Sequence, residues 1–358
     1  MTRVGAASFY RATGGMSPLR WPLALRHGEL FAVGMTRVLR IHQPGGPDRL
    51  AIESLELPAP ARGEVRLRHE AIGVDFIDCH HRAGRYPLPA LPHGLGLEAV
   101  GVVEAIGDGV TGLRCGDRVA YAGGAPGAYA EARNVEAWRL LKVPDGLDAT
   151  LVAAAFLRGL TAEFLVRRTF KVGPGHRVLV HAAAGGLGVL LCQWLRHVGA
   201  TVFGTVSTRE KVDCAYTNGC HHVLVRGEAS FVDGVRRITA QKGLDVVYDS
   251  IGQLTLRDSL RCLHRRGFLI AFGYASGVPA AIELAELANG SLFVTRPRLD
   301  DYCSTRQELV RAAEVLFPLL RGGVLRPQVA AVLPLAEAAV AHARLEAGGS
   351  MGSFVLVP

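Results

Sequence analysis

A glycine-rich turn between an apolar run and an amphipathic run constrains this chain more than any other feature. The segment RVLVHAAAGGLGVLLCQWL, residues 177–195, places Ala183, Gly185 and Gly188 at the spacing of the dinucleotide fingerprint. Small residues are needed there because the turn is tight, the backbone must approach a pyrophosphate, and the helix must pack closely on the strand. The start of that helix offers unpaired N–H groups to the phosphates. The segment therefore predicts a dinucleotide site.

The pattern around this turn predicts an α/β fold with two domains. From about Leu160, apolar runs such as ATVFGTV, LDVVYDS and GFLIAFG alternate with helical segments, among them residues 187–198. Strands that alternate with helices indicate βαβ units and a doubly wound parallel sheet, that is, a Rossmann domain. Short β-type runs with Gly-Asp and Pro turns precede them and indicate a strand-rich domain. We expect domains at 35–159 and 160–296, and a C-terminal segment, 297–358, whose last strand returns to the first domain.

The first 34 residues do not resemble the rest of the chain. They contain four arginines, one acid and no sustained periodicity, whereas Met35 begins MTRVLRIHQPGGPDRL, which indicates a first strand and a turn. We expect 1–34 to be a disordered, dispensable extension of a cytoplasmic protein. Its Arg-rich, acid-poor composition also suits mitochondrial targeting, and an ordered arm is a third possibility.

Charge and composition limit the partners that we expect. The net charge is +8 and the pI is near 9.3, which suits nucleic acid, an anionic membrane or a phosphate-bearing cofactor. Arg257, Arg261 and Arg265 would share one helical face, but without the aromatic residues that single-strand binders use. No run approaches the roughly 20 apolar residues of a membrane span. Seven cysteines without a C-x-x-C pair indicate a reducing compartment. We expect neither a nucleic-acid nor a membrane partner.

The end of the next predicted strand indicates which dinucleotide binds. NAD-specific folds carry an acid there, about 20 residues after the turn, to hold the ribose hydroxyls. This chain has GTVSTREK, with no acid before Glu210. Hydroxyls and cations suit a 2′-phosphate instead, and an arginine can bind it through two hydrogen bonds. We therefore predict NADPH, bound at this edge by Ser207, Thr208, Arg209, Lys211 and, from the following strand, Arg226.

Several motifs in order resemble one family from Met35 to Pro358. AIGVDFIDCHHRAGRYPLP, LPHGLGLEAVGVV, GDRVAYAGGAPGAYAE, HAAAGGLG, DVVYDSIG, RRGFLIAFG and SLFVTRP are similar to the zinc-independent NADPH:quinone oxidoreductases, including zeta-crystallin, of the medium-chain dehydrogenase/reductase superfamily. The resemblance implies a GroES-like catalytic domain that is interrupted by a Rossmann domain, an active site between them, and a homodimer.

The resemblance also assigns residues to the site. It implies that Tyr86 lies near a flat quinone ring. It implies that Phe76, Ile77 and Asp78 approach the nicotinamide, and that Gly186 and Leu187 approach the pyrophosphate. The residues implied to line the nicotinamide side of the site are Phe272, Gly273, Tyr274, Pro297 and Leu299. The chain departs from the bacterial quinone reductases at Asp75, which is typically Asn, and at His80, which is commonly Tyr. A C-terminal Arg that holds the cofactor in those enzymes has no counterpart in EAGGS, residues 346–350.

The metal ligands of zinc alcohol dehydrogenases have no counterparts here. The corresponding positions are Asp75, Leu97 and an apolar residue of VAAAFL, residues 152–157, and catalytic zinc requires three ligands and an open position. The adjacent Cys79, His80 and His81 lack the usual ligand spacing. We expect no metal.

A metal-free site limits the chemistry. Reducing a simple carbonyl develops an alkoxide that a Lewis acid would stabilise, whereas a quinone or conjugated carbonyl delocalises the incoming charge. We predict NADPH-dependent reduction of a small quinone, with Tyr86 beside the ring and Asp75 or His80 as a local proton donor. An enone or enoyl double-bond reductase stays open on the same fold. A non-catalytic NADPH- or RNA-binding protein also stays open, because fold does not fix function.

Overall fold

The computed structural model describes residues 24–26, 29–31 and 34–358. Within the predicted extension, β1 (Ala24–Arg26) and β2 (Glu29–Phe31) form an antiparallel pair that the sequence did not predict. They belong to a compact unit, Met1–Met35, that is separate from the unit Thr36–Pro358. The rest of the expectation for 1–34 lies outside the described residues.

A six-stranded parallel sheet forms the Rossmann part of the larger unit. Its strand order is β13-β12-β11-β14-β15-β16, so the chain reverses direction across the sheet between β11 and β14. Such a switch point is where open α/β sheets bind ligands. In chain order the strands are β11 (Arg177–Val180), β12 (Thr201–Val206), β13 (His222–Val225), β14 (Leu244–Asp249), β15 (Leu263–Ala271) and β16 (Phe293–Thr295).

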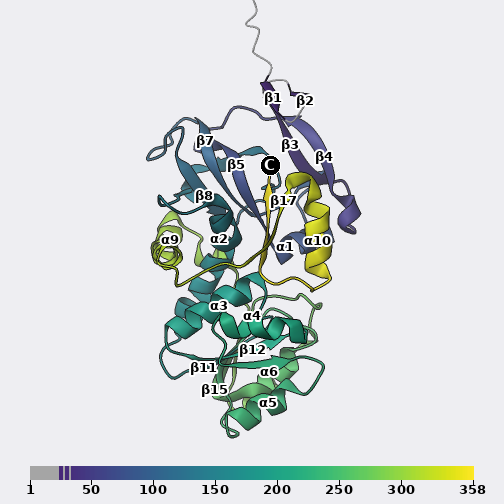
Figure 1. The fold of residues 1–358 in the computed structure, drawn as a ribbon, viewed down its shortest axis with the longest axis vertical. Helices are drawn as coiled ribbons and strands as arrows, with labels where there is room; N and C mark the ends of the chain where they lie inside the picture. The colour runs from purple at the N-terminus through teal and green to yellow at the C-terminus, as the bar shows by residue number, and fades with distance from the viewer. Residues whose placement is uncertain (1–23, 27–28, 32–33) are drawn as a thin grey trace, which may run out of the picture. The chain divides into compact units, whose positions relative to one another are not determined.

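Helices cover both faces of this sheet, as alternating side chains require. In β11, Val178 and Val180 pack in one core with α3, whereas Leu179 packs in another with α5 and α6. The helices are visible on either side of the strands in Figure 1. They are α3 (Gly186–His197), α4 (Val212–Thr217), α5 (Phe231–Ile238), α6 (Leu256–Cys262), α7 (Leu284–Ala288) and α8 (Leu299–Tyr302).

The strand-rich part, which the family resemblance implies is the catalytic part, is built on a mostly antiparallel sheet of order β10-β8-β7-β5-β18-β17. β9 also pairs with β5, and a smaller sheet has the order β4-β3-β6. The central strand β5 follows the alternation of buried and half-buried residues expected of a strand with one covered face. The strands are β3 (Met35–Ile41), β4 (Ala51–Glu56), β5 (Glu64–Val74), β6 (His93–Gly94), β7 (Glu98–Ile106), β8 (Arg118–Ala122), β9 (Ala132–Glu136) and β10 (Leu141–Lys142).

The C-terminal segment joins the sheet of the first domain. α9 (Arg306–Arg321) begins at Thr305, whose side chain caps Glu308 N, and packs on α2. β17 (Val329–Pro334) and β18 (Ser353–Val357) then complete the sheet, with Phe354 opposite Val74 of β5. α10 (Ala338–Glu346) packs on α1 (Phe76–Arg82), so the yellow end of the chain lies beside α1 in Figure 1.

One helix connects the two parts. α2 (Ala149–Phe164) begins at Asp148, which accepts a hydrogen bond from Leu151 N, and it packs on β5, β7 and α3. It thus crosses the boundary expected between residues 159 and 160. By length and composition the stretch Ala149–Thr169 could cross a membrane, contrary to the expectation that no run approaches that length, but 72% of its apolar window is buried inside the protein. It is placed as the core helix of a packed domain.

The α/β fold class is confirmed: a parallel Rossmann sheet and a strand-rich, mostly antiparallel part share one chain. One local expectation was wrong. α6 ends at Cys262 and β15 begins at Leu263, so Arg265 lies in a strand and shares no helical face with Arg257 and Arg261. Those two arginines pair with Glu286 and Asp258.

Candidate functional site

The predicted cofactor residues of the Rossmann part gather at one edge of the sheet. The glycine turn follows β11, Ser207 follows β12, Arg226 follows β13 and Phe272 follows β15. Because all six strands are parallel, their carboxyl ends meet at the same edge. The strand order places the glycine turn at the centre, the predicted phosphate-binding cations toward β13, and Phe272, Gly273, Tyr274, Pro297 and Leu299 toward β16.

The glycine turn is closed tightly against its own backbone. A Cβ added at Gly188 would lie only 2.1 Å from Ala182 O, which is too close for any side chain. A Cβ added at Gly186 would lie 2.8 Å from Nε of Arg158. Gly185 is the residue before α3, and its N–H donates to Ala182 O at 2.9 Å. Leu187 follows in the first turn of the helix. The helix start therefore has backbone N–H groups and no side chains at the positions where a pyrophosphate would approach.

Lys211 and Arg226 are two neighbouring cations, and neither forms a close ion pair with a carboxylate among residues 34–358. Burial lowers the pKa of Lys211, and the nearby Arg226 lowers it further; burial also lowers the pKa of Arg226, against the pull of Asp249. The Lys211 ammonium donates to Gly348 O, and the buried Nε of Arg226 has no hydrogen-bond partner. A dianion bound between two half-desolvated cations would stabilise both, so this pair has the charge and burial that the predicted 2′-phosphate contact requires.

Arg209 is placed differently from these two cations. Its guanidinium makes two contacts with the Glu228 carboxylate, Nε to Oε1 at 2.6 Å and Nη2 to Oε2 at 2.7 Å, and its side chain is 78% exposed. Ser207 and Thr208 are exposed beside it. Because Nε and Nη2 of Arg209 are already engaged by the Glu228 carboxylate, Arg209 is the weakest of the predicted phosphate contacts.

An aromatic cluster, Phe76, His80, His81 and Tyr86, lies on and just after α1. Ring centroids are 5.1 Å apart for Phe76 and His80 and 5.0 Å apart for His80 and Tyr86. Burial is the main cause that lowers the pKa of His80 to about 4, with Arg85 adding to it, so the imidazole is neutral at pH 7. The predicted role of His80 is therefore limited to an N–H donor or an acceptor. Ile77 is half-buried on the same helix.

Arg296 joins this cluster to the Rossmann part. Its Nη2 donates to the Tyr86 hydroxyl at 3.0 Å, and its Cζ lies 3.9 Å from the ring centroid of Tyr274. No ion pair involves Arg296 in the part of the chain that the structure describes. Tyr86 and Tyr274 were predicted as site residues from two distant segments of the sequence. Both contact Arg296, a residue that the sequence analysis did not assign to the site.

Asp78 does not present its carboxylate to this surface. Arg82 donates to Nδ1 of His342 at 3.2 Å, so His342 is the neutral tautomer whose Nε2–H points to the Tyr129 hydroxyl at 2.9 Å. Tyr129 in turn donates to Oδ2 of Asp78 at 2.9 Å, and Asp75 N donates to the same oxygen. The fully buried Asp78 therefore anchors the start of α1, and its predicted cofactor contact cannot come from its carboxylate.

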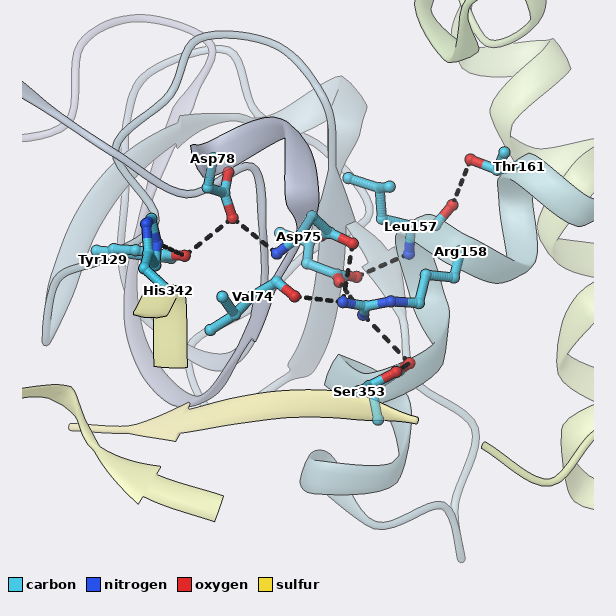
Figure 2. Close-up of polar contacts among 11 residues, drawn as sticks. Val74, Asp75, Asp78, Tyr129, Leu157, Arg158, Thr161, His342 and Ser353 are labelled. Atoms are coloured by element: carbon cyan, nitrogen blue, oxygen red, sulfur yellow. Dashed lines mark hydrogen bonds and ion pairs between the residues drawn. The ribbon is translucent and has the colours of Figure 1, made fainter. Parts of the chain in front are cut away.

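Asp75 is held by an arginine that the sequence did not single out. Oδ1 of Asp75 lies 2.9 Å from Nη2 of Arg158 (Figure 2). Oε1 of Glu98 lies 3.1 Å from Nη1 of the same arginine. All three side chains are buried. Burial raises the pKa of Glu98 well above its usual range, and Asp75 adds to this. An engaged carboxylate inside the protein is poorly placed for the proton-donor role predicted for Asp75.

Two hollows in the surface of the described residues lie away from the predicted site residues. One, of about 550 Å³, is lined by Glu163, Arg167 and Arg311, and a neighbour of about 450 Å³ by Lys171 and Trp194. No predicted site residue lines either of them, so we do not place the substrate there.

Comparison with known proteins identifies the family. Residues 61–145 match the alcohol dehydrogenase GroES-like domain, and residues 186–311 match the family described as zinc-binding dehydrogenase. Quinone oxidoreductase 1 of Escherichia coli is 41% identical over 90% of this chain and 100% of its own length. The chain belongs to the quinone oxidoreductase family. The solved E. coli quinone oxidoreductase complexed with NADPH superposes with a TM-score of 0.88 at 41% identity, over 90% of this chain and all of that one. A 2-haloacrylate reductase of a Burkholderia species is 47% identical over 89% of this chain and 98% of that protein.

The family description mentions zinc, but this quinone oxidoreductase family member has no donor set for it. Asp75 is paired with Arg158, Leu97 is apolar, and residues 152–157 supply no ligand atom from their side chains. In the described residues, no group of three or more His, Cys, Asp and Glu side chains is arranged to hold a metal ion. The residues present do not fit a catalytic zinc.

Metal analysis tests this conclusion on the purified protein. We expect no stoichiometric zinc, and we expect incubation with a chelator to leave activity intact, because the ligand positions hold a paired carboxylate and apolar residues. Mass spectrometry of the metal content and an activity assay after dialysis against a chelator measure both. One tightly bound zinc per chain would contradict the donor-set argument.

Proposed function

We propose that this protein is an NADPH-dependent quinone reductase that works without a metal. NADPH, when bound, supplies a hydride; with a proton from solvent, the quinone becomes the hydroquinone. The proposal is supported most by one observation: the aromatic cluster of α1 meets Tyr274 and Arg296 at the end of the sheet where the nicotinamide is expected.

The residues of this chain would act by binding and orienting. Lys211 and Arg226 would hold the 2′-phosphate, and the start of α3 the pyrophosphate. Flat side chains such as Phe76 and Tyr86 suit stacking on a planar quinone. The Tyr86 hydroxyl accepts from Arg296, so its own hydrogen can be donated to a quinone oxygen as charge develops there. Stacking and the Tyr86 hydroxyl would together orient the quinone. Orientation is enough for this reduction because the quinone itself delocalises the incoming charge.

A substrate panel tests the function. Purified protein is mixed with NADPH and, separately, with ortho-quinones, para-quinones, alkenals and 2-haloacrylate, and NADPH oxidation is followed by absorbance. We expect kcat/KM to be highest for a quinone. If kcat/KM is higher for every alkene substrate than for the quinones, the protein is a double-bond reductase and the quinone proposal is wrong. If the protein binds NADPH but oxidises it with none of these substrates, a non-catalytic role is supported.

A second candidate is reduction of the double bond of an unsaturated carboxylate, and Arg296 favours it. An arginine without an ion pair in the described chain, fixed on the Tyr274 ring, can bind a carboxylate through two hydrogen bonds. The 47% identical Burkholderia protein is named a 2-haloacrylate reductase. In the Arg296→Gln variant, KM for 2-haloacrylate would rise at least about tenfold if this arginine binds the carboxylate. KM for an uncharged quinone should change much less, and equal changes would exclude carboxylate recognition by Arg296.

We also propose a cytoplasmic homodimer, without a membrane or nucleic-acid partner. β16 is the last strand of the Rossmann sheet, and its Phe293 and Val294 are 50% and 36% exposed. An apolar edge strand suits pairing with a second copy. Sedimentation analysis would give twice the chain mass if this edge is covered in solution.

A further inference from the structure

Arg158 lies where several structural elements of the site meet. It belongs to α2, its Nη2 donates to Val74 O at the end of β5 and pairs with Asp75 at the start of α1, and its Nη1 pairs with Glu98, the first residue of β7. Figure 2 shows the guanidinium beside Val74 and Asp75, with Ser353 of β18 near it. One planar cation therefore joins four elements of the catalytic part.

The same side chain also touches the cofactor turn. A Cβ added at Gly186, the first residue of α3, would lie 2.5 Å from Oγ of Ser353, 2.8 Å from Nε of Arg158 and 3.1 Å from Cδ of Arg158. A Cβ at Gly73 of β5 would lie 2.0 Å from Oε1 of Glu98. The paired side chains thus fill a space between two glycines, one in each domain. A shift of the guanidinium would be transmitted to the predicted pyrophosphate turn and to α1 together.

The donors of Arg158 are used inside the protein. Nη1 donates to Glu98 Oε1 and, at 3.3 Å, to Ala154 O, while Nη2 serves Val74 O and Asp75. The side chain is 7% exposed. It is therefore not free to polarise a substrate oxygen, and its effect on the reaction must pass through the groups that it holds.

By the correspondence with zinc alcohol dehydrogenases drawn from the sequence, Arg158 lies beside the positions that carry the metal ligands in those enzymes. Asp75 and Leu97 stand at two of the ligand positions, Glu98 follows Leu97 directly, and Arg158 follows the VAAAFL segment that carries the third position. We propose that Arg158 is a positioning residue that substitutes for the structural effect of the metal, by locking α1 and the cofactor turn into one arrangement. A guanidinium suits this because its planar fork can bind two carboxylates and carbonyls in fixed directions.

The test compares Arg158→Met and Arg158→Lys with the wild-type protein, each shown to be folded by circular dichroism at the assay temperature. Two quantities are measured: the Kd of NADPH, by fluorescence titration without substrate, and kcat and KM with a para-quinone. We expect Arg158→Met to raise the NADPH Kd about tenfold and to lower kcat up to about a hundredfold, because small displacements of reacting groups cost that much. KM for the quinone should change less than about threefold, because the quinone is expected to contact the aromatic cluster and not Arg158. Arg158→Lys should lie between, since one ammonium cannot span both carboxylates.

Arg82→Met is the matched control. Arg82 is equally buried and pairs with Glu346, but it faces α10 and not the cofactor turn. It should lower the melting temperature and leave the NADPH Kd within about twofold, because its loss breaks a buried ion pair without moving Gly186. If the folded Arg158 variants lower only the melting temperature and keep both the NADPH Kd and kcat, the proposal is overturned. Should Arg158→Met not fold, the same criterion applies to Arg158→Lys alone.

The kcat part of this test rests on the proposed function, whereas the Kd part does not. If the wild-type protein binds NADPH but reduces no quinone, the function is wrong and the Kd comparison still decides the role of Arg158. If the wild-type protein reduces quinones and the Arg158 variants match it in both quantities, only the role of Arg158 is wrong.

Discussion

Replacing Lys211 and Arg226 together by alanine is expected to raise KM for NADPH about a hundredfold or more while hardly changing KM for NADH. A 2′-phosphate carries nearly two negative charges, and each charge-assisted hydrogen bond to it contributes about 1.5 to 3 kcal/mol. Two such contacts together would strengthen NADPH binding more than about a hundredfold, because 1.4 kcal/mol corresponds to a factor of about ten in affinity. The wild-type protein should accordingly prefer NADPH. Steady-state kinetics with both cofactors at saturating quinone measure the effect.

Arg209→Ala is the control for this double variant. Arg209 is exposed and engaged by Glu228, so its removal should change KM for NADPH less than about threefold. Equal use of both cofactors by the wild-type protein, or equal weakening of both in the double variant, would show that Lys211 and Arg226 do not bind the phosphate. A large effect of Arg209→Ala would instead mean that Arg209 leaves Glu228 when the cofactor binds.

The Gly188→Ala variant should lose most of its stability and its cofactor binding. Its Cβ would lie 2.1 Å from Ala182 O and 2.9 Å from Ala183 Cα, both backbone atoms that cannot move aside without opening the turn. We expect the free energy of unfolding to fall by about 3 kcal/mol or more, at the upper end of what overpacking costs. Urea unfolding followed by circular dichroism measures the loss.

Gly185→Ala is the matched variant in the same turn. Its Cβ would meet only Ala182 O, at 3.3 Å, so the unfolding free energy should change by less than about 1 kcal/mol. NADPH binding should still weaken, because the backbone at Gly185 is expected to approach the pyrophosphate. Similar stability losses in the two variants would mean that the turn is not as closely packed as the structure has it.

Local patterns sufficed to predict the Rossmann part of the fold, whereas the GroES-like domain was implied by the family resemblance. The segment predicted as a helix over 187–198 is α3, Gly186–His197, and the run ATVFGTV contains β12. These elements follow from periodicity and from the glycine turn, both of which act over a few neighbouring residues. β1 and β2 were missed because each has only three residues, too few to show a period.

The buried charges of the site could not be predicted in the same way. Asp75 was interpreted as a candidate proton donor because a carboxylate near a nicotinamide suggests chemistry, but its partner, Arg158, lies far along the chain. Tyr129 and His342, which hold Asp78, come from still other segments. One signal was present: a lone arginine inside the apolar run VAAAFLRGL indicates a buried cation that must have an acidic partner.

The position of β18 has a consequence for how the chain is made. β18 is the neighbour of β5 in the catalytic sheet, and it follows the whole Rossmann part along the chain. Until β18 emerges from the ribosome, the end of β5 at residues 72–74 has an unpaired edge, because β9 pairs only with residues 64–68. The Rossmann part, which lies between β5 and β18 in the chain, has already been synthesised by then. Because domains usually fold as they are synthesised, the Rossmann part can form first, while the catalytic part has to wait until β18 has been synthesised. Truncated or stalled chains would therefore expose the β5 edge, a surface that chaperones bind and on which aggregation begins.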